Sequence, residues 1–230
     1  MKVKLIALAV FITIFLIIEI GVFVFFYKDF LLTVLFGSGI PKEPLNPSFE
    51  LTRSLTNIPQ YWYYGPLFAF DSDDQPWDVS EFYITSGYTG NALKANLDEI
   101  DSFHKVKSNL FALDNKMYTL TFYMKPEMIG NDPDSGFDVE IFITDSSNNL
   151  IVDWAIVFNN DNIRKEEWLG ADILDIDVSW EDVGNGWKKV NVEFLDNFPK
   201  DSKARLYLEE YRDRDYTGTV LIDEISFEVV

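Results

Sequence analysis

The chain has 230 residues, of which 47% are hydrophobic and 16% aromatic, so it has enough apolar material for one sizeable core. Its 38 acidic residues outnumber its 19 basic ones, and the resulting net charge of -19 repels the phosphates of nucleic acids. The chain has no cysteine and a single histidine, His104, which excludes disulfides, thiolate metal sites and imidazole clusters. Carboxylates, amides, carbonyls and aromatic rings remain, and these groups suit the binding of sugars or calcium.

The first element along the chain is an apolar run over residues 5–27, interrupted by one charge, Glu19. Its length predicts a transmembrane helix, in which a single glutamate is tolerated at modest cost. Lys2 and Lys4 precede the run, so the positive-inside rule places the N-terminus in the cytoplasm and the rest of the chain outside. We therefore predict a single-pass membrane protein with an anchor over residues 1–36.

Two other interpretations of this segment stay open, a cleaved signal peptide and a pilin-like leader. We favour an uncleaved anchor because the apolar run is longer than the core of a usual signal peptide. In addition, no clear A-x-A site follows the run, and apolar residues continue to Phe36. Beyond the anchor, residues 37–45 read as a linker rich in Gly and Pro, and residues 46–230 as the extracytoplasmic domain.

The acidic surplus has two explanations, and both remain open. It favours solubility in a salty or hot habitat, or it includes carboxylates that hold calcium. Two acidic runs, residues 71–74 and 172–177, lack the glycine and terminal glutamate of an EF-hand loop. We expect these two runs to be solvated loops.

Within the domain, apolar and polar residues alternate with a period of two, which is typical of half-buried strands. In residues 137–144, for example, Phe137, Val139 and Ile141 share one face, whereas Asp138 and Glu140 lie on the other. The same alternation occurs over residues 118–125, 189–194, 204–209 and 220–228.

Turn signals separate these predicted strands, at residues 134–136, 147–149 and 184–186. Residues 151–158 are apolar on both faces, which is typical of a strand in the middle of a sheet. One segment, residues 162–169, could form a short helix. Many short strands without a βαβ rhythm predict an all-β fold, an antiparallel β-sandwich, after the single N-terminal transmembrane helix.

The order and spacing of several short segments resemble carbohydrate-binding modules with a galactose-binding-like jelly-roll fold, of the kind attached to xylanases. Each segment is weakly specific alone, and many proteins with this fold bind no sugar. Together the segments span residues 46–228, nearly the whole predicted domain. They comprise residues 46–50 as an opening strand, Trp62, residues 86–94, residues 118–125, residues 187–190 and residues 218–227.

The resemblance implies a structural calcium ion. Its side-chain ligands would be Glu50 of the opening strand and Asp223 of the last strand, with backbone carbonyls from near Gly90 and Asn91. Calcium accepts six to eight oxygen ligands in loose geometry, so it can join distant strands. The alternative is that Glu50 and Asp223 are ordinary charges at strand ends.

The resemblance also implies a sugar-binding surface, in which aromatic rings stack on pyranose faces while amides and carboxylates reach the hydroxyls. Any one aromatic residue can instead serve packing or cross-strand stabilisation, as Trp62 does in this fold. Which polar face would be concave stays open. The candidate ligand-binding residues are Trp62, Tyr64, Trp77, Tyr123, Glu140, Phe142, Asn191 and Tyr207.

The sequence gives little support for catalysis. Pairs of carboxylates are expected by chance in so acidic a chain, and His104 is accompanied by no G-x-S-x-G motif. We therefore predict a non-enzymatic, membrane-anchored carbohydrate-binding domain, stabilised by calcium, whose partner is a polysaccharide or cell-surface glycan. The alternative is a structural subunit of a cell-surface assembly that uses the same fold for protein contacts.

Overall fold

The structure of the chain is a computed structural model. It describes residues 40–52, 58–66, 76–100, 104–113, 117–130, 136–159, 162–169, 175–195, 198–211 and 216–229. Pro41–Val230 forms one compact unit, and Met1–Ile40 is a separate one. The predicted anchor over residues 1–36 lies outside the described residues. Among those described, none belongs to a helix with the length and apolarity that a membrane crossing requires.

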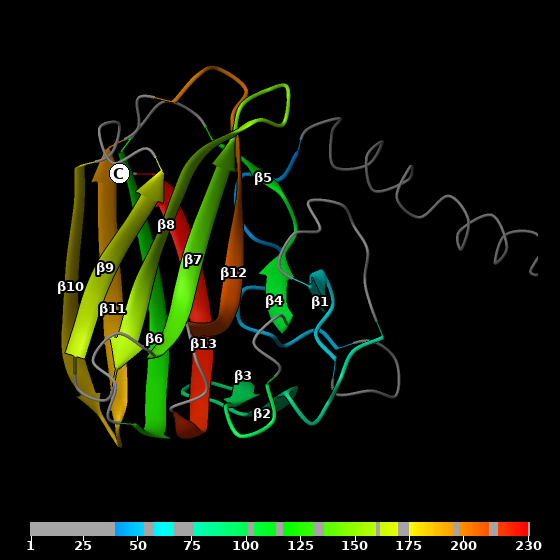
Figure 1. Cartoon of the computed structure of the whole chain (residues 1–230), viewed down its shortest axis with the longest axis vertical. Helices are drawn as coiled ribbons and strands as arrows, with labels where there is room; N and C mark the ends of the chain where they lie inside the picture. The colour runs from blue at the N-terminus through cyan, green and yellow to red at the C-terminus, as the bar shows by residue number, and fades with distance from the viewer. Residues whose placement is uncertain are drawn as a thin grey trace, which may run out of the picture. The chain divides into compact units, whose positions relative to one another are not determined.

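The described part of Pro41–Val230 contains two stacked antiparallel sheets, shown in Figure 1 with the seven-stranded sheet in front. The fold is therefore the predicted antiparallel β-sandwich. The seven-stranded sheet has the order β1 (Trp62–Pro66), β4 (His104–Ser108), β12 (Lys203–Tyr211), β7 (Gly136–Thr144), β8 (Leu150–Asn159) and β9 (Asn162–Leu169), with β5 (Phe111–Ala112) paired to β12. The six-stranded sheet has the order β10 (Asp175–Gly184), β11 (Trp187–Leu195), β6 (Met117–Ile129), β13 (Thr217–Val229), β3 (Asn91–Asn96) and β2 (Phe82–Ser86).

The core lies between the inner faces of the two sheets, where alternate residues of each strand point inward. Leu206, Ile141 and Trp154 are aligned across β12, β7 and β8, and all three are fully buried. Phe122 of β6 supplies the same kind of side chain from the opposite sheet. Because burying one large apolar side chain contributes roughly 1.5–3 kcal/mol, this layer is the main source of stability.

The five strands predicted from alternation are all present, and each observed strand contains the predicted range. Residues 118–125 lie in β6, 137–144 in β7, 189–194 in β11, 204–209 in β12 and 220–228 in β13. Residues 151–158 lie in β8, which pairs with β7 on one side and β9 on the other, as the apolar pattern indicates.

Residues 175–177 belong to strand β10, with Ile176 buried, instead of the expected solvated loop. Two further predictions of local structure are wrong. Residues 162–169 form strand β9 instead of a short helix, because pairing with β8 places Ile163 opposite the buried Phe158 and overrides the local preference. Residues 46–50 form a turn instead of an opening strand. Asn46 and Phe49 have φ angles of 53° and 58°, which interrupt an extended backbone.

Candidate functional site

The hairpin loop between β2 and β3 is held by carboxylates from two distant parts of the chain. The backbone N–H of Gly87 donates to the Gly90 carbonyl across the loop, at 2.9 Å. Glu50 accepts a hydrogen bond from the Asn91 N–H through Oε1 at 2.7 Å. Asp223 accepts one from the Thr89 N–H through Oδ2 at 3.0 Å. The loop is therefore fixed at both ends by charged acceptors.

Two glycines allow the carboxylates to approach the loop this closely. A Cβ atom at Gly90 would lie 1.9 Å from Oε1 of Glu50, and one at Gly87 would lie 2.4 Å from Oδ2 of Asp223. Gly90 also has a φ angle of 64°, which glycine adopts at little cost. Glycine at these two positions therefore allows Glu50 and Asp223 to reach the loop.

A β-bulge in β13 brings Asp223 and Glu224 to the loop. The pairing with β6 gains one extra residue between Asp223 and Ser226, and Glu224 within the bulge has a φ angle of 50°. The Glu224 N–H donates to Oδ1 of Asp223 at 2.8 Å, and the Thr89 hydroxyl donates to Oε1 of Glu224. Three carboxylates therefore converge on one loop.

All four predicted calcium ligands, Glu50, Gly90, Asn91 and Asp223, meet at this loop. Their oxygens are of the hard type that calcium prefers. The Asp223 side chain is fully buried, and burial raises its pKa to about 6, although the loop N–H groups oppose that shift. A nearby cation would relieve the cost of this buried charge. Backbone N–H groups already donate to both carboxylates. Within the described residues, no three acidic or histidine side chains lie close enough together to hold a metal ion by themselves.

Three aromatic residues meet at the loop, the exposed Tyr88, the half-buried Tyr123 and the buried Trp187, and we call them the Tyr88 platform. The rings of Tyr88 and Tyr123 stack with centroids 4.3 Å apart and planes 14° apart. Trp187 meets Tyr88 edge-on at 5.8 Å. Tyr88 remains 40% exposed, and among the aromatic residues that the structure describes Trp180 is exposed to a similar extent. The Tyr88 ring therefore packs on the Tyr123 ring and remains accessible to solvent.

Polar side chains flank the Tyr88 platform on the outer face of the six-stranded sheet. Tyr123 lies opposite Asp223 on β13 and opposite Lys189 on β11. Asn191, the next outward residue of β11, is half-buried and accepts a hydrogen bond from the Thr121 hydroxyl at 3.0 Å. Of the predicted ligand-binding residues, Tyr123 and Asn191 thus lie on this face. Sequence reasoning missed Tyr88, whose only signal is its place in the loop between the two glycines.

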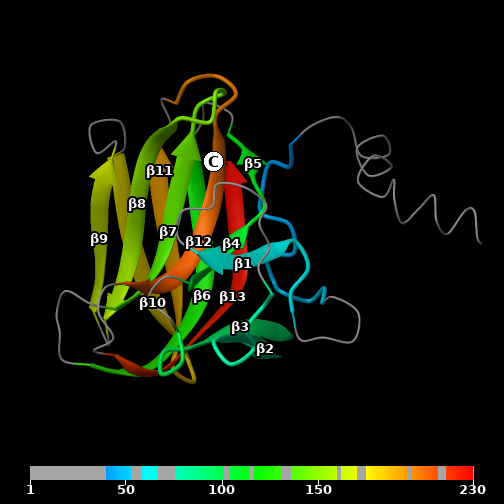
Figure 2. The ribbon, with the colours of Figure 1, turned by 45° about the vertical axis from the view of Figure 1, so that its right-hand side comes forward.

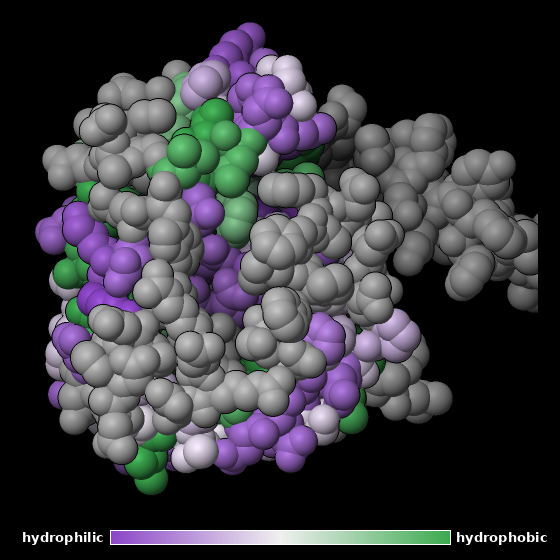
Figure 3. All heavy atoms as spheres, viewed as in Figure 1, coloured by the Kyte–Doolittle hydropathy of each residue, from purple (hydrophilic) through white to green (hydrophobic). Residues whose placement is uncertain are grey.

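Three other predicted ligand-binding residues, Glu140, Phe142 and Tyr207, lie on the outer face of the seven-stranded sheet. Phe142 and Tyr207 form a ring pair with centroids 4.6 Å apart. Lys105 lies beside them, with Nζ 2.9 Å from both Glu140 and Glu209. In Figure 3, hydrophilic side chains are visible near the middle of this face, and a hydrophobic patch lies above them. Tyr207 and Glu140 are nevertheless only 3% exposed, which limits their contact with a ligand.

Asp138 and Asp153 complete an acidic cluster on this face, which we define as Asp138, Glu140, Asp153 and Glu209 around Lys105. Burial raises the pKa of Glu140 to about 7 and that of Glu209 to about 8, against the lowering effect of Lys105. Burial also raises the pKa of Asp138, whose two carboxylate oxygens have no hydrogen-bond partner, and that of Asp153. Lys105 lowers the pKa of all four acids, but burial outweighs it and leaves each pKa above its ordinary value.

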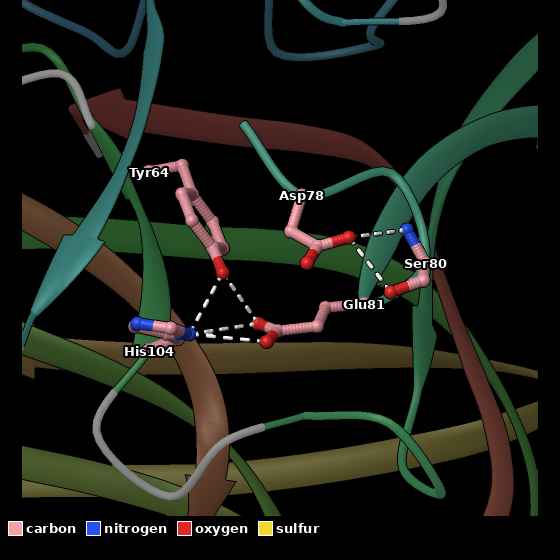
Figure 4. A network of polar contacts seen from close by, with 5 residues as sticks. All are labelled: Tyr64, Asp78, Ser80, Glu81 and His104. Carbon is pink, nitrogen blue, oxygen red and sulfur yellow. Dashed lines mark hydrogen bonds and ion pairs between the residues drawn. The ribbon is translucent and has the colours of Figure 1, made fainter. Parts of the chain in front are cut away.

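Tyr64 and Trp77 occupy a third place, where β1 and β4 lie close to β2 (Figure 2). The Tyr64 hydroxyl donates to Glu81 at 2.7 Å, and His104 Nδ1 lies 3.0 Å from the same carboxylate (Figure 4). The Tyr64 and Trp77 rings are 5.7 Å apart, and Trp77 donates through Nε1 to the Phe82 carbonyl at 2.6 Å. This network closes one end of the core. His104 is the first residue of β4, which lies between β1 and β12 in the sheet.

Trp62 has no exposed surface and belongs to the core. Its ring packs on Phe49 at 5.1 Å, and Nε1 donates to the Asn46 carbonyl at 3.1 Å. Trp62 is therefore a packing residue and not a surface ligand contact. The eight predicted ligand-binding residues are distributed over the outer faces of the two sheets and the core, and do not form one site.

Comparisons with known proteins find similar solved structures at low sequence identity. No protein-family model and no curated protein matches the chain. Among solved structures, it is similar to the CBM22-1 xylan-binding domain of Paenibacillus barcinonensis Xyn10C, with 12% identity over 83% of this chain and 97% of that one, and a TM-score of 0.40. It is also similar to the K1 cleaved adhesin domain of Lys-gingipain from Porphyromonas gingivalis, with 14% identity over 80% and 96% of the two chains and a TM-score of 0.39.

A third similar structure is the enzymatically active domain of tailspike protein 4 from bacteriophage CBA120, with 10% identity over 83% of this chain and a TM-score of 0.44. The match spans 22% of the tailspike chain. Two of the similar solved structures are thus carbohydrate-binding modules. Similarity at this level defines no ligand, so the functional argument rests on the side chains of the chain itself.

Proposed function

We propose that the protein is a non-catalytic glycan-binding protein whose binding surface is the Tyr88 platform. The observation that carries this proposal is the exposed Tyr88 ring, stacked on Tyr123 at 4.3 Å. The fixed ring costs little conformational entropy when a ligand binds, because the loop that carries it is already held by Glu50 and Asp223.

The proposed binding mode divides between stacking and hydrogen bonding. The apolar face of a pyranose lies on the exposed face of Tyr88, as aromatic rings favour in sugar sites. Lys189 and Asn191, both half-buried and on the same face as Tyr123, are placed to donate to sugar hydroxyls. A charge-assisted bond from Lys189 is stronger than one between neutral groups, so it would contribute more to orientation.

Calcium at the loop is the second part of the proposal. Glu50 and Asp223 would hold the ion, together with carbonyl groups near Gly90 and Asn91. When bound, the ion would neutralise the buried Asp223 carboxylate and stiffen the loop beneath Tyr88. Its support is the convergence of these groups from three distant segments of the chain.

The third part of the proposal is the location. The apolar run over residues 5–27, with Lys2 and Lys4 before it, supports a single membrane anchor that leaves the glycan-binding domain outside the cytoplasm. A domain held in this way would keep a polysaccharide or cell-surface glycan close to the membrane.

The test is retention of the full-length chain on a panel of soluble and insoluble polysaccharides, with calcium and again with a chelator. We expect retention on at least one class of glycan, and weaker retention after chelation. Failure on every glycan in both conditions, with the protein folded by circular dichroism, would overturn the proposal. It would favour the alternative of a structural subunit in a cell-surface assembly.

A further inference from the structure

Strand β10 forms one edge of the six-stranded sheet, at the left of Figure 1. It pairs with β11 in continuous register from Asp175 to Asp182, and within the described residues no other strand pairs with it. The Ile176 carbonyl accepts a hydrogen bond from Lys165 Nζ of β9 at 3.4 Å, so a donor from outside the six-stranded sheet reaches this backbone. Alternate N–H and C=O groups along the outer side of β10 are therefore open to another strand.

The β10 edge lacks the features that usually protect an exposed strand. Edge strands are typically short, or carry lysine, proline or a bulge that prevents pairing with another chain. β10 has ten residues, DIDVSWEDVG, without a basic residue or a proline, and its bulge lies at the end, between Asp182 and Gly184. The edge strands β1 and β2 have five residues each, and β9 contains Arg164 and Lys165. Of the described edges, β10 is therefore the best suited to receive another strand.

One face of β10 is apolar. Ile176 is buried, Val178 packs partly against the core, and Trp180 is 41% exposed. Together with Ile163 of β9, these side chains are among those that line a cavity of about 450 Å³. The Lys188 ammonium lies 4.1 Å from the centroid of the Trp180 ring and holds the indole by a cation–π contact. Because side chains alternate along a strand, every second side chain of an added strand would contact this apolar face.

The other face of β10 is acidic. Asp177 lies directly opposite Glu193 of β11, both are exposed, and neither forms an ion pair within the described residues. Glu181, by contrast, lies opposite Lys189. Like charges directly opposite one another destabilise a pair of strands, so a basic side chain beside Asp177 would relieve this repulsion. A second copy of β10 would instead add further acidic residues, and charge therefore favours a basic partner over a dimer formed through this edge.

We propose that β10 binds an extended segment of another protein by strand addition, and that basic and apolar side chains alternate along this segment. Backbone hydrogen bonds to the open edge supply affinity, and the alternating side chains supply specificity. The apolar side chains contact Val178 and Trp180, and the basic ones lie beside Asp177. A backbone N–H of the added strand replaces Lys165 Nζ at the Ile176 carbonyl. This protein-binding edge is a further function and does not depend on glycan binding.

The test is fluorescence anisotropy of short labelled peptides titrated with the full-length chain at physiological salt. The basic peptide alternates lysine and valine, and an acidic control alternates glutamate and valine. A third peptide keeps every lysine but has proline in place of the central valines, which removes backbone N–H donors without changing the charge. In the protein, Asp177→Lys reverses a charge at the β10 edge. Glu228→Lys is the matched control, because Glu228 is exposed on the same sheet but belongs to β13.

We expect the basic peptide to bind at least about tenfold more tightly than either control peptide. Asp177→Lys should weaken its binding at least about fivefold, whereas Glu228→Lys should change it by less than about twofold. Hydrogen exchange should show that the peptide protects backbone amides of β10 and not those of β2. Equal binding of the proline peptide would reduce the effect to charge attraction alone. That result, equal binding of the acidic peptide, or no binding to the folded protein would each overturn strand addition at β10 and leave the proposed glycan binding untouched.

Discussion

The ring of Tyr88 lies on the ring of Tyr123, with centroids 4.3 Å apart and planes 14° apart. Tyr123 belongs to β6, whereas Tyr88 belongs to the loop between β2 and β3, which Asp223 holds through the Thr89 N–H. Because Asp223 lies directly opposite Tyr123 in the β6–β13 pairing, the same carboxylate supports the loop and adjoins the ring. Loop stability and glycan binding should therefore be coupled.

Replacing Gly90 with alanine should destabilise the protein. The new Cβ would lie 1.9 Å from Oε1 of Glu50, at a φ angle of 64°, so Glu50 must move away from the loop. The matched control is Gly184→Ala, because Gly184 also has a positive φ, 94°, but nothing lies within 4 Å of its Cβ position. Positive φ costs an alanine about 1–2 kcal/mol at either site. Urea denaturation should show a clearly larger loss for Gly90→Ala, and equal losses would contradict the contact with Glu50.

Calcium should raise the thermal midpoint of the wild-type chain and not that of Asp223→Asn. A ligand present at about 100 times its Kd stabilises the folded state by about 2.7 kcal/mol, which corresponds to several degrees in a domain of this size. Glu193→Gln is the control, because Glu193 is exposed on the same sheet and should keep the full calcium response. The same calcium shift in Asp223→Asn as in the wild type would remove Asp223 from the site.

The acidic cluster predicts that the protein loses stability as pH rises from about 5 to 8. The folded-state pKa values of Glu140 and Glu209, about 7 and about 8, exceed the ordinary value of 4.5, so the folded state retains protons that the unfolded chain releases. Each retained proton lowers the free energy of unfolding by up to about 1.4 kcal/mol per pH unit. Asp223, with a pKa of about 6, acts in the same direction. Thermal midpoints should fall by at least about 5 °C across this range.

Lys105 does not reverse this dependence. Burial lowers its pKa, but the charges of Glu209 and Glu140 outweigh burial and raise it, so its contribution is constant below pH 10. Asp138→Asn removes one acid from the cluster and should raise the thermal midpoint at pH 8 and flatten the slope. Asp182→Asn is the control, because the Asp182 side chain is 72% exposed. A midpoint that is constant or rises from pH 5 to 8 would show that the cluster is not protonated in the folded state.

Much of the fold could be predicted from the sequence, because the alternation of apolar and polar residues indicates which face of a strand packs on the core. This worked for the long strands, such as β6 and β13, whose inward residues are all large and apolar. It failed for residues 162–169, where the spacing of the charged residues is compatible with a helix although the segment forms an edge strand. The opening strand over residues 46–50 was expected from the resemblance and not from alternation, and it is absent because Asn46 and Phe49 take left-handed conformations. Asn46 followed by Pro47 is a turn signal that the resemblance overrode.

The site was less predictable, because it depends on residues that meet only after folding. Alternation correctly placed Asp138 and Glu140 on the outer face of β7, but that face is buried, which a period of two does not reveal. Tyr88 lies in a loop and has no partner in any strand pattern, so its stacking on Tyr123 depends on the position of the loop. The resemblance identified Glu50 and Asp223, which no local pattern connects.

The most direct measurement of the central claim is calorimetric titration of Tyr88→Ala and wild-type chain with an oligosaccharide of the glycan that the wild type retains. Tyr83→Ala is the control, because Tyr83 is a half-buried ring on the same sheet that contacts Lys94 and lies outside the Tyr88 platform. We predict that Tyr88→Ala weakens binding at least about tenfold, which corresponds to about 1.4 kcal/mol, while Tyr83→Ala binds as the wild type does. Unchanged affinity in Tyr88→Ala, with the same thermal midpoint, would contradict the claim that the Tyr88 platform is the glycan-binding surface.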